Sequence, residues 1–316
     1  MSVPTSSRGL RRTTAPKAPG STARRRRRSG LGSTALGRVF LAPSGVVMTL
    51  VLLFPIGYAF VLSLGAYDGR RYEGFAGLAN YTEALTSARF WDGMWNTAVF
   101  TVTSVSAEFV IGMIFALIMN QAFRGRGGTR AVILIPWVIP TVVAAQMWSI
   151  LFNIQPGFIN SLLGLGNFNW LGREGWAMAA IVFADVWKTA PFVALLLLAG
   201  LQTIPDELYE SAALDGAGAW QRFLNVTLPL LKPAILVALL FRTVQALRVF
   251  DLPQVMTFGQ FGTETLSILV QEYVVRTVDL GLGSALSTLT FVVVLGVGML
   301  FIKALGREAV LSGGER

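Results

Sequence analysis

Six apolar segments recur along this sequence, separated by stretches of charged, glycine-rich and proline-rich residues. About 20 consecutive apolar residues are enough to cross the hydrocarbon core of a bilayer as a helix. The segments lie at about residues 39–67, 95–119, 131–152, 176–201, 233–256 and 284–302. Proline favours the first turn of a helix, so Pro233 predicts the start of the fifth segment. The pattern predicts an all-α integral membrane protein with six transmembrane helices.

The composition supports this interpretation and excludes most enzyme classes. Hydrophobic residues make up 53% and charged residues 14% of the 316 residues, with a mean hydropathy of +0.60. Soluble domains average about 25% charged residues. The sequence has no Cys and no His, which excludes disulfides, thiol catalysis, zinc sites of the usual kind and His-based nucleophilic catalysis. We therefore expect no catalytic residue and no metal site.

Basic residues are concentrated at the N-terminus. Ten of the 26 Lys and Arg residues lie before position 39, among them the run Arg24–Arg28, and no acidic residue accompanies them. We expect residues 1–37 to be a disordered tail that stays in the cytoplasm and touches anionic lipid. Nuclear targeting or nucleic-acid binding is the alternative for the Arg run. Basic residues also dominate the C-terminal end, so we predict a six-span domain over 38–306 and a cytoplasmic tail over 307–316.

One polar segment, residues 202–232, departs from the positive-inside pattern because it carries four acidic residues. Thr203 and Asp206 resemble a capping box, which predicts a helix over about 205–215 with apolar positions available for burial at Leu208, Ala212 and Leu214. Gly216 and Gly218 allow the turn that ends this helix. A second short helix follows, with Trp220, Phe223 and Leu224 on it, and we expect Pro229 and Pro233 to stop it. The segment therefore predicts a helix–turn–helix projection into the cytoplasm.

The same segment carries a spaced motif. Glu210-Ser211-Ala212 is followed after three residues by Gly216 and, nine residues later, by Val226-Thr227-Leu228-Pro229. This resembles the EAA loop of bacterial ABC importer permeases, with Ser in place of the middle Ala and Val in place of Ile. The wider sequence, about residues 35–305, is similar to the carbohydrate-uptake branch, the maltose-type permeases.

The resemblance implies a type I ABC importer permease fold in which the projection is a coupling helix that docks on an ATP-hydrolysing subunit. The residues it assigns to this contact are Glu210, Ser211, Ala212, Asp215, Gly216, Leu228 and Pro229. The chain lacks a phosphate-binding G-x-x-x-x-G-K-[ST] motif, so ATP and Mg²⁺ are expected in the partner and no cofactor in this chain. The implied partners are a second homologous permease, two ATP-binding subunits and an extracytoplasmic solute-binding protein. The implied location is the bacterial plasma membrane, and a homodimeric permease remains open.

Charged residues inside the apolar segments are the candidates for further chemistry, because such residues are costly in a bilayer and usually face a partner or a polar path. Asp185 and Lys188 lie three residues apart and could pair on one helix face. Arg248 and Asp251 are a further possible polar pair. These residues either hold the helix bundle together or line a polar cavity. Glu108 and Asn120 are weaker candidates with an expected structural role.

The resemblance also implies a sugar-binding site, since the maltose-type permeases contact sugar through a Trp-x-x-x-Pro-aromatic stretch and the next span. Carried over to this sequence, the substrate-binding residues are Trp187, Lys188, Thr189, Phe192, Arg242, Gln245, Ala246 and Val249. Lys188 and Arg242 are charged where the maltose type is uncharged, which predicts a different substrate. On this interpretation Arg242→Ala abolishes uptake and leaves assembly of the complex intact.

The predicted function is import of a sugar, a disaccharide such as trehalose or maltose, by alternating access driven by ATP hydrolysis in the partner. A glycerol 3-phosphate importer of the same family is an alternative, because two basic residues lie among the substrate candidates. A proton-coupled secondary transporter using Asp185 or Glu108 is an alternative from another class, but such proteins tend to have inverted repeats and we find none. A scaffold that anchors a cytoplasmic partner explains the projection but not the intramembrane charges.

Overall fold

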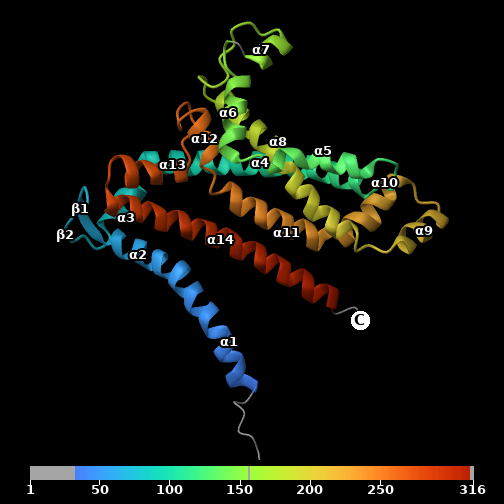
Figure 1. Cartoon of the computed structure of the whole chain (residues 1–316), viewed down its shortest axis with the longest axis horizontal. Coiled ribbons are helices and arrows are strands. Elements are labelled where there is room, and N and C mark those ends of the chain that lie inside the picture. Colours follow the sequence, from blue (N-terminus) through green and yellow to red (C-terminus); the bar gives the residue numbers. More distant parts are fainter. Residues whose placement is uncertain (1–32, 156, 314–316) are drawn as a thin grey trace, which may run out of the picture. The chain divides into compact units, whose positions relative to one another are not determined.

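The computed structural model describes residues 33–155 and 157–313 and divides the chain into two units, Met1–Leu53 and Phe54–Arg316 (Figure 1). In the first unit, α1 (Ser33–Met48) continues into a π-helical turn, η1 (Thr49–Leu53). The side chains of residues 40–53 are exposed. Most of the expected basic tail, residues 1–32, lies outside the described residues, as do residues 314–316 at the C-terminus.

The second unit begins with α2 (Phe54–Ser63), a β-hairpin and a short helix. Strands β1 (Gly65–Asp68) and β2 (Arg71–Phe75) pair antiparallel, and α3 (Ala79–Thr86) follows. Asn80 Nδ2 donates hydrogen bonds to the carbonyls of Ser63 (2.8 Å) and Gly65 (2.9 Å), which fixes the point where the helix gives way to the strand. The predicted first span was therefore too long at its C-terminal end, since the apolar helix ends at Ser63.

Four long helices build the body of the second unit: α4 (Ala88–Asn120), α8 (Trp176–Leu201), α11 (Leu228–Ala246) and α14 (Leu280–Gly313). The α4–α8 pair is the most extensive contact between elements. It requires a glycine at position 112, because a Cβ there would lie 2.8 Å from Val193 Cγ1. Phe100, Ile181 and Leu197 are among the fully buried side chains at the helix contacts. The predicted fourth span is confirmed at both ends, and the second and sixth are longer than predicted.

The predicted third span is two helices. α5 (Arg126–Val138) and α6 (Thr141–Leu151) meet at an angle of 91°. Ile139 and Pro140 between them are extended, because proline disfavours the helical conformation in the residue before it. Among the described residues, five helices are long and apolar enough to cross a membrane, or six if this bent pair counts as one span. The predicted third span is therefore built from two helices rather than one, although its helical character was predicted correctly.

The predicted fifth span is also divided. Helix α11 begins at Leu228 rather than at Pro233, and it ends at Ala246. Phe250 then leaves the helical region (φ −137°, ψ −56°) before α12 (Asp251–Met256). The chain goes on through a loop to α13 (Leu266–Gln271) and a π-helical turn, η3 (Glu272–Arg276), before α14. One further short helix, α7 (Phe158–Leu163), lies between α6 and α8.

The segment between α8 and α11 contains the two expected short helices, α9 (Asp206–Leu214) and α10 (Ala219–Arg222). Two details of the prediction were wrong. The Thr203 hydroxyl donates to the carbonyl of Gly200 (2.7 Å), so it does not cap α9. Pro229 and Pro233 do not stop the second helix, because a π-helical turn, η2 (Phe223–Thr227), runs directly into α11.

Candidate functional site

Three charged side chains from three different helices meet inside the second unit. Arg242 on α11 donates from Nη2 to Oε1 of Glu108 on α4 (2.8 Å) and from Nε to the other oxygen of the same carboxylate. It also donates from Nη2 to Asp185 on α8. Glu108 is fully buried, and the other two side chains are nearly so. We call Glu108, Asp185 and Arg242 the core triad.

Thr189 extends the core triad by one hydroxyl group. Its Oγ1 lies 2.6 Å from Glu108 Oε1 and 2.5 Å from the carbonyl oxygen of Asp185, and it donates toward both acceptors. The proton is thereby directed into the protein, which leaves the oxygen lone pairs as acceptors. Thr189 itself is only partly buried.

Lys188 is the second cation of this region. Its side chain is 8% exposed, and within the described part of the chain it forms neither an ion pair nor a hydrogen bond. The core triad has two carboxylates and one guanidinium, so it carries one excess negative charge when all three groups are ionised. Lys188 on the same helix as Asp185 brings the local sum to zero.

This geometry changes the pairing predicted from the sequence. Asp185 binds Arg242 rather than Lys188, so the predicted pair within one helix was wrong. Arg248 is exposed and forms no ion pair with Asp251 among the residues described, and the chain leaves the helix between them. Glu108, for which a structural role was expected, has a central position that the sequence argument undervalued. A carboxylate in the middle of an apolar span was the available signal.

The eight predicted substrate residues do not lie together on one surface. Thr189 and Lys188 lie beside the core triad, and Arg242 belongs to it. Ala246 is buried in the core and Gln245 is exposed, while Val249 packs against the same core cluster. The two aromatic residues face the broken span α5–α6: Trp187 meets Trp148 edge to face at 5.4 Å, and Phe192 stacks on Trp137 at 5.8 Å.

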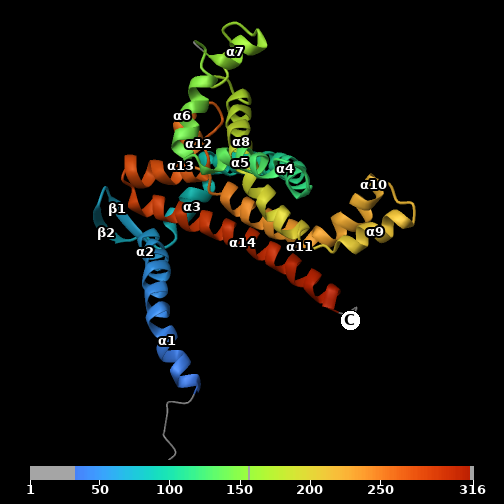
Figure 2. The same ribbon diagram turned by 45° about the vertical axis from the view of Figure 1, so that its right-hand side comes forward.

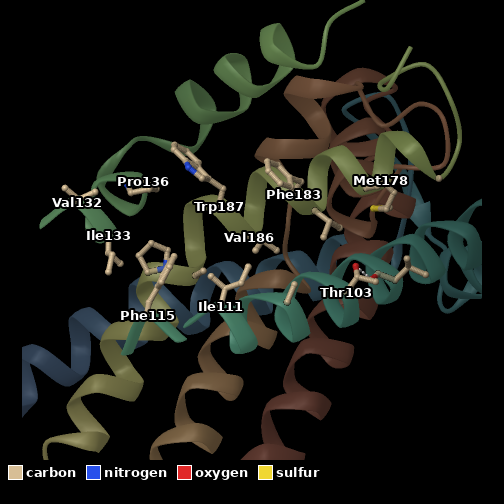
Figure 3. Close-up of a pocket in the computed structure, with 17 residues that line it drawn as sticks. Thr103, Ile111, Phe115, Val132, Ile133, Pro136, Met178, Phe183, Val186 and Trp187 are labelled. Atoms are coloured by element: carbon tan, nitrogen blue, oxygen red, sulfur yellow. Dashed lines mark hydrogen bonds between the residues drawn. The ribbon is translucent and has the colours of Figure 1, made fainter. Parts of the chain in front are cut away.

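A large cavity of about 860 Å³ lies between α4, α5 and α8 (Figure 3). Its lining is almost entirely apolar and includes Ile111, Phe115, Pro136, Phe183 and Trp187. Of the predicted substrate residues, Trp187 alone contributes to this lining. A polyhydroxylated ligand needs convergent polar groups, which this lining lacks, so the polar candidates for substrate binding lie instead around Thr189 and Lys188.

The segment 206–227, called the knob below, projects beyond the ends of α8 and α11 (Figure 2). Helix α9 ends at Leu214, and the predicted turn glycine follows at Gly216, which has a φ of +81° that favours glycine. The N–H of Gly216 donates to the carbonyl of Ala213, and that of Ala217 to the carbonyl of Ala212, closing the helix end.

The knob leaves its apolar side chains exposed. Leu214 is 90% exposed and Trp220, stacked on Phe223 at 5.4 Å, is 69% exposed. No residue of α9 is buried, so Leu208 and Leu214, which were predicted to be available for burial, are exposed in this chain. Glu210, Ser211, Asp215 and Pro229 are exposed, whereas Ala212 and Leu228 are half-buried. An exposed surface of this kind is typical of a protein–protein contact.

Among the described residues, no group of three or more acidic side chains is arranged to hold a metal ion. The chemistry available in the second unit is therefore hydrogen bonding and charge pairing near Thr189, together with surface contact at the knob.

Comparisons with known proteins identify the family of this chain. The family described as binding-protein-dependent transport system inner membrane component matches residues 108–308. The trehalose/maltose transport system permease protein MalF of Thermococcus litoralis is 44% identical over 274 residues, which cover 85% of this chain and 92% of that protein. The trehalose transport system permease protein SugA of Mycobacterium tuberculosis is 39% identical over 289 residues, covering 91% and 93%.

A further relative, the sulfoquinovosyl glycerol transport system permease protein SmoG of Agrobacterium fabrum, is 38% identical over 281 residues, covering 86% of this chain and 91% of that protein. Among solved structures, a bacterial ABC transporter that imports the acidic polysaccharide alginate matches with a TM-score of 0.74 and 22% identity, covering 86% of this chain and 95% of that one. At this identity the structural match establishes the fold, and it confirms the predicted importer permease architecture.

Proposed function

Because this chain belongs to the family of binding-protein-dependent transport system inner membrane components, we propose that it is the permease subunit of an ABC importer that brings a sugar into the cell. The proposed substrate is a disaccharide, trehalose before maltose. The observation that carries the proposal is the high identity over most of the chain to permeases whose names specify trehalose and maltose. The chain is a transport subunit rather than an enzyme.

The side chains around the core triad support a hydroxyl-rich substrate. Thr189 offers an acceptor and Lys188 a donor, while Trp187, next to Lys188 on the same helix, lines the apolar cavity. Sugars are recognised by such a mixture of polar groups and an aromatic ring face. Of the eight residues first assigned to the substrate, these three remain our proposed contacts.

The charge balance favours a neutral sugar over glycerol 3-phosphate. An anionic substrate requires uncompensated positive charge, and Arg242 is compensated twice by carboxylates. Lys188 alone then faces the excess negative charge of the core triad. A proton-coupled mechanism through Asp185 or Glu108 is disfavoured for the same reason, because both carboxylates are held by Arg242.

We further propose that ATP hydrolysis in two copies of a separate subunit drives alternating access through the knob. The exposed Leu214 and Trp220 supply the contact surface, and Glu210 and Gly216 supply the acidic contact and the turn. ATP and Mg²⁺ bind in that partner. A second homologous permease completes the membrane domain, and a solute-binding protein delivers the sugar from outside. The knob and both termini face the cytoplasm in this arrangement of a multi-pass plasma-membrane protein.

The test is ATP hydrolysis by the complex reconstituted in proteoliposomes with its binding protein, with trehalose, maltose or glycerol 3-phosphate added. We expect stimulation by trehalose, weaker stimulation by maltose and none by glycerol 3-phosphate. Gly216→Pro should abolish stimulation, because proline cannot adopt a φ of +81°. Stimulation by glycerol 3-phosphate alone would overturn the substrate class. Uptake that follows a proton gradient without a co-purifying ATPase would overturn the importer mechanism.

A further inference from the structure

Keeping the three charged side chains of the core triad inside an apolar helix bundle is energetically unfavourable. Burying three charges costs free energy that their mutual attraction only partly returns, and well-packed apolar residues of similar volume often do as well. The helices α4, α8 and α11 also share apolar contacts through Phe100, Ile181, Ala184 and Ala246, so the triad is not needed to bring them together. A buried charge cluster in such a bundle therefore calls for a role beyond holding the helices in contact.

The hydrogen bonds of the triad lead to Thr189. Arg242 holds Glu108 through two of its nitrogens, and this fixes the position of both carboxylate oxygens. One of these oxygens, Oε1, also accepts the Thr189 hydroxyl proton at 2.6 Å. A hydroxyl has one proton and two acceptor lone pairs, so a proton shared between Glu108 Oε1 and the Asp185 carbonyl (2.5 Å) leaves only the acceptor side of Thr189 for another ligand.

Arg242 is poorly suited to bind a substrate directly. Its side chain is 4% exposed, and Nε and Nη2 already donate to two carboxylates. Thr189 and Lys188 on the adjacent helix differ from it in this respect. Thr189 is partly exposed, and the Lys188 ammonium forms no hydrogen bond or ion pair in the described ranges 33–155 and 157–313.

We infer that the core triad is a positioning device, in which Arg242 fixes Glu108 and Glu108 orients the Thr189 hydroxyl as an acceptor for a substrate hydroxyl. Arg242 does not contact the substrate. The inference rests on the proposed function, since it concerns the site of the transported sugar. It reverses the role that the sequence alone suggested for Arg242.

The first experiment separates charge balance from substrate contact at Arg242. Arg242→Gln leaves two buried carboxylates without a cation, so the complex should lose about 6–10 °C in its unfolding midpoint and lose transport with it. The triple variant E108Q/D185N/R242Q removes all three charges and keeps hydrogen-bonding groups at each position. We expect it to regain most of the midpoint and to keep trehalose-stimulated ATPase with a KM within about threefold of wild type. Arg276→Gln, which removes an Arg from an exposed pair with Glu272, is the matched control and should match wild type in both measurements.

The second experiment tests the hydroxyl itself. Thr189→Val is nearly isosteric and removes the acceptor, so KM for trehalose should rise about tenfold while kcat and the unfolding midpoint change little. Thr189→Ser should restore KM, which a purely structural role of the methyl group would not do.

The outcomes separate this inference from the proposed function. A triple variant that assembles at the wild-type midpoint but is not stimulated by trehalose, together with a wild-type KM in Thr189→Val, would mean that Arg242 contacts the sugar, and the inference would be wrong. If the triple variant fails to assemble, an unchanged KM in Thr189→Val overturns the inference on its own. A wild-type complex that none of the sugars stimulates overturns the proposed function, and the inference with it.

Discussion

The core triad and the knob both gather charged or aromatic side chains, but they satisfy them in opposite ways. In the core triad, each charge meets an opposite charge from another helix, with partners 134 and 57 positions apart in the sequence. In the knob, Glu210 and Trp220 are exposed, and no side chain of α9 is buried. The charged groups of the core triad are thus paired within this chain, whereas the knob leaves its side chains exposed.

The difference separates two kinds of functional evidence. A cluster whose bonds are complete, such as the core triad, acts through its geometry on the residues beside it. A surface whose apolar groups are left exposed, such as the knob, is complementary to another molecule, because large exposed apolar groups are unfavourable unless a partner covers them. Substitutions in the first region should therefore affect the stability of this chain, and those in the second should affect its association.

The largest expected effect is a loss of stability when the core triad is broken. Arg242→Met should lower the free energy of unfolding of the complex by about 3–5 kcal/mol, because it leaves Glu108 and Asp185 buried without a counter-charge. Arg276→Met breaks an exposed ion pair with Glu272 and should cost less than about 1 kcal/mol. Unfolding in detergent followed by intrinsic fluorescence measures both. Equal losses in the two variants would contradict the special position of the core triad.

The next effect lies in the knob. Trp220→Ala should weaken binding of the ATP-hydrolysing subunit by about 2–4 kcal/mol, as expected when an aromatic anchor is removed from an interface. The unfolding midpoint of the permease should stay the same, because Trp220 is 69% exposed in this chain. Trp95 on α4 has the same exposure, and Trp95→Ala serves as the control that should leave this binding unchanged. Co-purification with titrated ATPase subunit measures the affinity. A loss of permease stability without a loss of binding would place Trp220 in the fold instead.

The contrast also explains which parts of the structure were predictable from the sequence. The bounds of α8 followed from a long, predominantly apolar run, which is a property of neighbouring residues alone. The end of α9 just before Gly216 followed from glycine chemistry for the same reason. The bend between α5 and α6 was missed although Pro140 was visible, because a proline in an apolar run either kinks a helix or ends it, and the surroundings decide which.

The core triad could not be predicted from local sequence patterns. The sequence placed Asp185 on the fourth span and Arg242 on the fifth, and a rule for residues three apart suggested Lys188 as the partner of Asp185. The actual partner depends on which faces of α4, α8 and α11 meet, and helix periodicity within a single span does not contain that information. For a related reason the sequence indicated that Leu214 was available for burial but not what would cover it, since an apolar helix face looks the same whether this chain or another protein covers it.

The smallest effect gives the sharpest comparison, because it contrasts two glycines of the same turn. Gly216 has a φ of +81°, whereas Gly218 has a φ of −69°, and both have room for a methyl group. Gly216→Ala should therefore strain the knob by about 1 kcal/mol, while Gly218→Ala should be neutral. If the knob passes motion between subunits as a rigid body, this strain should lower sugar-stimulated ATPase several-fold, leave basal ATPase unchanged and increase amide exchange in α9. Equal behaviour of the two variants would mean that the turn is not under conformational constraint in the assembled transporter, and that the contact surface alone determines coupling.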